Sequence, residues 1–220
     1  MHIIWPQYFQ ILSLLLAIAC CKGLSKFRLW GLIPLLTIVC ITEFIGANRI
    51  YFGWKNNYLL YNCYLVLTFP IIMYIFFRML QYRGKAKKIF WGAILLTFFF
   101  LLSLFFEEGP YNFNEHILIV TEFASVILPL LVLIMLFKED DFSIMLYNHP
   151  YFWISGATMI FSISTLVILG LKEYIKSHNA QIDGQILYKV LIPMLNIVLY
   201  VSYSYACWLC YKIASKLPRQ

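Results

Sequence analysis

Seven long runs of apolar residues occupy most of the chain, and short polar segments separate them. A helix needs roughly 20 apolar residues to cross the hydrocarbon core of a bilayer. A run such as 94–102 (ILLTFFFLL) is apolar on every face, whereas the strands of a membrane β-barrel alternate apolar and polar positions. The pattern therefore predicts an all-α polytopic membrane protein in which residues 1–220 form a single seven-helix transmembrane domain. The predicted spans are 5–21, 29–47, 57–79, 88–106, 115–137, 150–171 and 185–211.

The composition agrees with this class. The chain is 62% hydrophobic and 12% charged, whereas soluble domains carry about 25% charged residues. The segments between the predicted spans are too short for a separate domain, which needs about 50 residues. We therefore expect no domain outside the membrane and no nucleic-acid partner, and the lipid bilayer is the main surrounding of the chain.

Basic residues concentrate on one side of the predicted spans. That side holds 12 of the 17 Lys and Arg residues. Cytoplasmic loops carry an excess of Lys and Arg, which predicts an N-terminus outside, a cytoplasmic C-terminus and a place in the cell inner membrane. The net charge of +7 then faces anionic lipid headgroups. The five basic residues on the outer side are Arg49, Lys55, Lys172, Lys176 and Lys189.

Polar side chains recur at helical spacing within several predicted spans. Steps of three and four residues place them on one face of a helix. Small hydroxyl residues in such a stripe also let two membrane helices approach closely. In the sixth span the stripe is Ser155, Thr158, Ser162 and Thr165, and in the seventh it is Lys189, Pro193, Asn196, Tyr200, Tyr203 and Cys207.

Apart from Glu115 at the first position of the fifth span, two carboxylates lie inside predicted spans: Glu43 near the outer end of the second span and Glu122 about two turns inside the fifth. A charged side chain deep in a span costs at least ~2.5–3.5 kcal/mol, so we expect both to face the bundle interior. With other polar residues of the outer half they predict one outward-opening ligand pocket. A structural polar network explains the same residues equally well. The candidate pocket residues are Glu43, Asn62, Glu122, Ser162, Lys189, Asn196 and Tyr200.

The sequence lacks the motifs of several common classes of enzyme. The sequence has no HExxH, GxSxG or phosphate-loop motif. Its four histidines lie at the ends of predicted spans, so we expect no metal site and no cofactor. An enzyme that acts on lipid with Glu43 or Glu122 as acid or base stays open, although no nucleophile accompanies these carboxylates.

One set of residues is informative when taken together: 149–156 (HPYFWISG), Glu43, Asn57, Asn62, Asn196 and Tyr200. This set resembles that of a group of uncharacterised bacterial seven-span proteins of about this length. Those proteins look like the membrane input modules that are fused to, or encoded near, histidine kinases. The resemblance implies a sensor or accessory role for the polar outer pocket.

The sequence thus favours an integral membrane sensor or interaction module that signals through a partner protein. The basic loop after the third span and the loop 140–149 are the expected partner contacts. One alternative is a structural or accessory subunit of a larger membrane complex, with the Phe-rich fourth span against a partner. The other is a small-solute transporter, against which the dry inner halves of spans two, four and five count.

Overall fold

The computed structural model describes residues 5–81, 84–107, 112, 114–138, 146–171, 174, 177, 181–182 and 185–216. The described chain is helical apart from two strands of two residues. A 3₁₀ helix, η1 (Leu146–Asn148), precedes α7, and β1 (Gln181–Ile182) pairs antiparallel with β2 (Gln185–Ile186) before α9. The α-helices are α1 (Trp5–Ala19), α2 (Cys21–Lys26), α3 (Leu32–Ala47), α4 (Tyr58–Leu80), α5 (Gly84–Glu107), α6 (Glu115–Lys138), α7 (Pro150–Gly170) and α9 (Leu187–Lys216).

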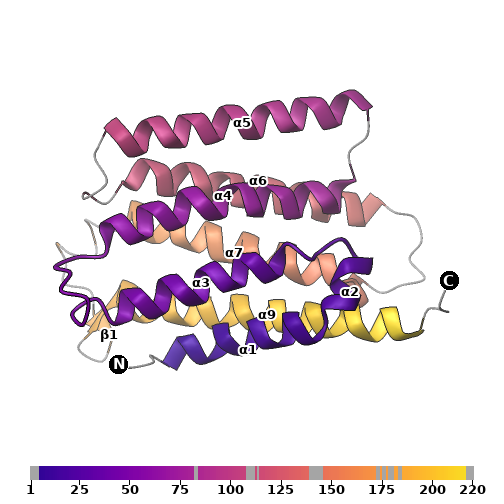
Figure 1. The fold of residues 1–220 in the computed structure, drawn as a ribbon, viewed down its shortest axis with the longest axis horizontal. Helices are drawn as coiled ribbons and strands as arrows, with labels where there is room; N and C mark the ends of the chain where they lie inside the picture. Colours follow the sequence, from indigo (N-terminus) through magenta and orange to yellow (C-terminus); the bar gives the residue numbers. More distant parts are fainter. Residues whose placement is uncertain are drawn as a thin grey trace.

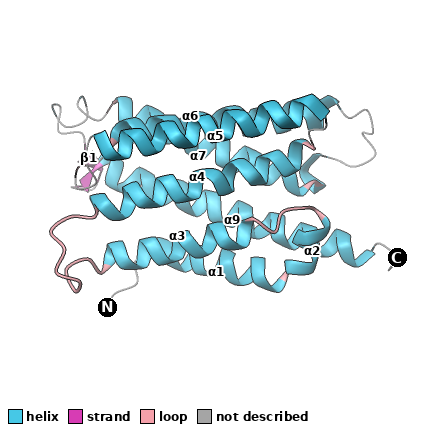
Figure 2. Ribbon diagram, turned by 45° about the horizontal axis from the view of Figure 1, so that its top comes forward, coloured by secondary structure: helices cyan, strands magenta, loops and turns pink. Residues whose placement is uncertain are grey.

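The helices α1, α3, α4, α5, α6, α7 and α9 lie side by side along the long axis of the molecule (Figures 1 and 2). The chain begins at one end of this bundle and finishes at the other (Figure 1). Helix α9 packs against α1, α2 and α7, while α6 joins α7 to α4 and α3 lies between α1 and α4. Helix α5 lies at the edge, against α4 and α6. Short α2 lies at the end of the bundle where the chain finishes, which we name the basic end.

Five helices are long and apolar enough to cross a membrane: α4, α5 from Phe90, α6, α7, and α9 from Val190. The apolar helices α1 and α3 have 15 and 16 residues. At 1.5 Å per residue they are about 23 and 24 Å long, less than the ~30 Å of hydrocarbon. The prediction of an all-helical chain with several membrane-spanning helices is confirmed.

The first predicted span, 5–21, ends two residues earlier in the structure, and a separate short helix follows after a break. Helix α1 ends at Ala19, and α2 begins at Cys21 and lies against α9. A Cβ atom on Gly23 would lie 2.8 Å from the Cys210 carbonyl carbon and 2.8 Å from the Tyr211 nitrogen. Only glycine permits this approach of two backbones, so the break positions α2 on α9.

The other helix boundaries differ from the predicted ones by a few residues. Three helices also contain an internal proline. Helix α5 begins at Gly84 instead of 88, and α9 extends to Lys216 instead of 211. The chain stays helical on both sides of the prolines within α4, α6 and α9, although each removes one backbone donor. These prolines are Pro70, Pro129 and Pro193.

Part of the apolar core lies in the half of the bundle nearer the basic end. Leu24, Leu32 and Met79 are fully buried there, from α2, α3 and α4. The exposed surface is also apolar, because lipid is its expected solvent: Leu96 on α5 is 74% exposed. Only 12% of the apolar stretch of α5 is buried. This agrees with its sequence, which has few polar residues.

Gly23→Ala should destabilise the protein, because the new methyl group meets the α9 backbone. Overpacking of this kind costs about 1–3 kcal/mol. Gly92→Ala is the matched control, since a Cβ there has no neighbour within 4 Å and alanine gains about 1 kcal/mol over glycine inside a helix. Thermal unfolding in lipid nanodiscs measures both. A Gly23→Ala protein as stable as the Gly92→Ala protein contradicts the close α2–α9 contact.

Candidate functional site

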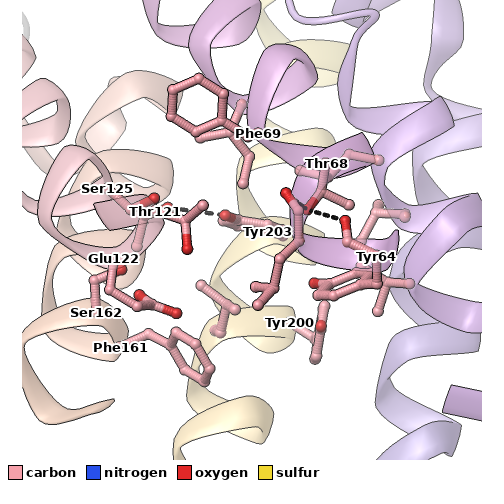
Figure 3. Close-up of a pocket in the computed structure, with 17 residues that line it drawn as sticks. Tyr64, Thr68, Phe69, Thr121, Glu122, Ser125, Phe161, Ser162, Tyr200 and Tyr203 are labelled. Carbon is pink, nitrogen blue, oxygen red and sulfur yellow. Dashed lines mark hydrogen bonds between the residues drawn. The ribbon is translucent and has the colours of Figure 1, made fainter. Parts of the chain in front are cut away.

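A cavity of about 80 Å³ lies inside the bundle, between α3, α4, α6, α7 and α9 (Figure 3). One polar wall comes from α6 and α7, and aromatic residues of α4 and α9 face it. Leucines and a valine of α3 close the side. The lining residues are Leu35, Leu36, Val39, Tyr64, Leu65, Thr68, Phe69, Ile72, Thr121, Glu122, Ser125, Thr158, Phe161, Ser162, Leu199, Tyr200 and Tyr203.

The polar wall follows from helical spacing. Thr121 and Ser125 are one turn apart on α6, and Thr158 and Ser162 are one turn apart on α7. These small residues are all buried and allow the two helices to pack closely. Glu122, between the two α6 residues, extends its carboxyl into the cavity (Figure 3). The Ser162 hydroxyl lies beside that carboxyl and interacts with it.

The facing wall is aromatic and more tightly bonded. The Tyr203 hydroxyl shares a hydrogen bond of 2.8 Å with Thr158 Oγ1, which ties α9 to α7. Thr68 Oγ1 donates to the Tyr64 carbonyl at 2.8 Å, so this hydroxyl is hydrogen-bonded within α4. The rings of Tyr200 and Tyr203 meet edge to face, with centroids 6.3 Å apart. Tyr64 of α4 and Tyr200 of α9 also line the cavity, so α4, α6, α7 and α9 all contribute hydroxyl or carboxyl residues.

The size of the cavity limits its contents. A buried water needs about 10–15 Å³ of such space and two to four polar partners. Ligand sites for drug-sized molecules have about 300–1,000 Å³. A space of about 80 Å³ therefore suits a few waters, an ion or a small molecule, and the Glu122 carboxyl is its one acidic group.

Three of the seven predicted pocket residues, Glu122, Ser162 and Tyr200, line this cavity together. Asn196, one turn before Tyr200 on α9, is half-buried and is not part of the lining. The side chain of Lys189 lies outside the described residues. The remaining two, Glu43 and Asn62, belong to separate polar contacts near the end of the bundle opposite the basic end.

Glu43 fastens α3 to its neighbours. The Tyr61 hydroxyl lies 3.4 and 3.5 Å from the two carboxyl oxygens of Glu43, which joins α4 to α3. The Gln7 amide donates to the Glu43 carbonyl at 2.8 Å, which joins α1 to the same turn. One turn further on, Asn57 Nδ2 donates to the Gly46 carbonyl at 3.1 Å. Glu43 therefore has a partner on α4 and does not line the cavity.

Asn62 organises the start of α6. Its side chain is fully buried; it donates to the Asn112 carbonyl at 2.6 Å and accepts from the Asn114 backbone nitrogen at 3.2 Å. Asn114 Oδ1 accepts from the Ile117 nitrogen at 2.9 Å and so caps α6. Asn62 thus holds the helix that carries Glu122, without touching the cavity.

Sequence reasoning missed some of the polar residues of the interior. Thr121 and Ser125 flank Glu122, and their spacing of four residues was the available signal. On α1, Gln7, Gln10 and Ser13 recur every three residues and are buried. Within the described part of the chain, Gln10 Oε1 and Ser13 Oγ have no hydrogen-bond partner. Apolar residues surround these positions in the sequence, which concealed the stripe.

Comparisons with known protein families, with curated proteins and with solved structures found no match to this chain. Among the described residues no group of three or more His, Cys, Asp and Glu side chains is placed to hold a metal ion.

Asn62→Leu should lower stability, because the buried Asn114 nitrogen and the Asn112 carbonyl lose a hydrogen-bond partner. Each such loss costs about 1–3 kcal/mol. Asn62→Asp keeps the acceptor for the Asn114 nitrogen and loses the donor to Asn112, so its loss should be intermediate. Thermal unfolding measures both, with half-buried Asn196→Leu as the control of smaller effect. If Asn62→Leu unfolds at the wild-type temperature, Asn62 does not organise the start of α6.

Proposed function

We propose that the chain crosses the inner membrane seven times and acts as a sensor or interaction module. In this proposal a small polar or cationic ligand, or water, occupies the cavity beside Glu122 and shifts α6 and α7. A partner protein responds at the basic end. The observation that carries the proposal is the half-buried Glu122 carboxyl, which faces a cavity lined by five membrane helices.

The energetics of Glu122 favour a site over simple packing. An ionised carboxylate inside a span costs at least ~2.5–3.5 kcal/mol, and an apolar side chain avoids that cost. Glu43 has Tyr61 as a partner, and Glu122 has the weak support of Ser162. A costly group beside open space is typical of a binding or switching residue.

Seven crossings are supported by the arrangement of the helices. Helices α1 and α3 are apolar and lie beside the five longer helices (Figure 1). The two ends of the chain lie at opposite ends of the bundle, as an odd number of crossings requires. The excess of Lys and Arg toward the end where the chain finishes favours a cytoplasmic C-terminus.

A path from the cavity to the basic end runs along α7. Ser162 and Thr158 lie at the cavity, and Tyr151 lies two turns nearer the basic end. The Tyr151 hydroxyl donates to the Phe27 carbonyl at 2.7 Å, which ties α7 to the turn between α2 and α3. The start of α7, residues 149–156, is the segment that resembles bacterial input modules. A shift of α7 would move its contact with Phe27.

A structural or accessory subunit is the second candidate, and the exposure of α5 favours it. Phe99 and Phe106 are 66% and 74% exposed on this helix. Lipid covers such a surface as well as a protein does. A stoichiometric partner cross-linked through α5, with unchanged partner binding in Glu122→Leu, would favour this candidate over the sensor.

The topology is tested with reporters fused to each terminus. We expect an enzyme that is active only outside the cytoplasm to work at Met1 and to fail after Gln220. A fluorescent protein that folds only in the cytoplasm should show the reverse. Two termini on the same side contradict seven crossings.

Glu122→Leu should raise thermal stability, because it removes the cost of a carboxyl group in the membrane. Glu122→Gln, which keeps shape and polarity, should change it less. Mass spectrometry of the purified proteins should find any retained small molecule lost from Glu122→Leu and kept in Glu115→Gln. If Glu122→Leu is less stable than wild type and binds the same small molecules and partners, Glu122 belongs to a structural network and the sensor proposal fails.

A further inference from the structure

A second pocket, of about 330 Å³, lies at the basic end. Four parts of the chain meet there: the turn between α2 and α3, the C-terminal end of α4, the last turns of α6 and the start of α7. The pocket is separate from the cavity at Glu122 and shares no residue with it. Its lining residues are Lys26, Phe27, Arg28, Gln81, Met135, Leu136, His149 and Tyr151.

The lining is rich in hydrogen-bond donors and cations. Lys26 and Arg28 are exposed and two residues apart, and the amide of Gln81 comes from α4. His149 lies at the start of α7. Among the residues that the structure describes, the lining contains no carboxylate.

Aromatic residues form another part of the pocket lining, and a hydrogen bond and ring contacts connect them. Tyr151 is buried, and its hydroxyl bonds to the Phe27 carbonyl. The ring of Phe27 meets those of His149 and Tyr151 edge to face, each with centroids 6.5 Å apart. The pocket lining therefore combines an aromatic cluster with the cationic side chains of Lys26 and Arg28.

The start of α7 does not itself supply the donors. Pro150 has no N–H, and the Tyr151 nitrogen donates to His149 Nδ1 at 3.3 Å. The Phe152 nitrogen donates to the His149 carbonyl at 3.1 Å. The backbone groups that normally attract anions at a helix start are thus engaged, and recognition falls to the side chains.

We propose that this pocket binds a phosphate-bearing anion. The guanidinium of Arg28 matches two phosphate oxygens at once, Lys26 adds a second charge and Gln81 adds a neutral donor. The volume fits a phosphate group with a small substituent. The anion is either the headgroup of an acidic phospholipid or a soluble phosphate compound, and both present the same chemistry. This proposal does not depend on the function proposed for the Glu122 cavity.

Binding would link three parts of the chain. Lys26 ends α2 and Arg28 lies in the turn that follows it, while Gln81 lies at the end of α4 and His149 at the start of α7. A single anion between them would hold these parts together at the basic end, where basic residues predict the cytoplasm.

The test uses the full chain in nanodiscs of neutral phosphatidylcholine. In the first arm, calorimetry measures the dissociation constant of inorganic pyrophosphate. In the second arm, phosphatidic acid is added to the nanodiscs and native mass spectrometry counts the retained acidic lipid. The variants are the double substitution Lys26→Gln with Arg28→Gln, and Gln81→Glu, which places a carboxylate in the pocket. Lys216→Gln removes one charge from the same end of the bundle, outside the pocket, and is the matched control.

We expect the double variant to bind about tenfold or more weakly for each charge removed, because charge-assisted hydrogen bonds are lost. Gln81→Glu should also weaken binding, and Lys216→Gln should leave it unchanged. Loss of binding in the first arm alone identifies a soluble ligand, and loss in the second arm alone identifies a lipid headgroup.

Equal binding by wild type, the double variant and the control in both arms overturns the proposal, because only diffuse charge attraction then remains. Absence of binding by wild type in both arms overturns it as well. Thermal unfolding without added anion checks that each variant is folded. Gln81→Glu keeps the test decisive if the double variant fails, since Gln81 is exposed and its replacement has the same size.

Discussion

In hydrocarbon every backbone N–H and C=O must find a partner inside the protein, and this constraint shapes the whole chain. It makes the apolar runs helical and turns the few polar side chains inward. Helix α6 shows the result: its buried positions include Thr121 and Ser125, and its exposed positions include Phe123 and Ile127. The interior is thus more polar than the surface at this depth, the reverse of a soluble protein.

The bundle divides into two unlike halves. Toward the basic end, apolar residues of α2, α3 and α4 are packed without exposure. Further from it lies the cavity, where Glu122 faces open space, and beyond the cavity Asn62 and Glu43 fasten the connections. Helix α7 runs from the cavity at Glu122 to Tyr151, which lines the second pocket at the basic end.

The sequence predicted the helices well because a span must be long and apolar. It did not predict which way each polar side chain points within the bundle. Glu43 and Asn62 have the depth expected of pocket residues, but they point to Tyr61 and to Asn112 and Asn114, partners 18 and about 50 residues away. Such contacts depend on how helices are rotated and arranged, which spacing along one helix does not reveal. Glu122 and Ser162 were found because a carboxyl group and a hydroxyl stripe stand out against apolar neighbours.

The rotation of α6 tests the account most directly. Single spin labels placed along residues 115–138, in protein reconstituted into bilayers, report collisions with oxygen dissolved in the lipid. The account predicts that the collision rate oscillates with the period of a helix. Its maxima should fall at positions 123, 127, 130 and 134, and its minima at 121, 125, 128 and 132. A scan of opposite phase, or one without a period, contradicts a bundle that turns its polar groups inward around Glu122.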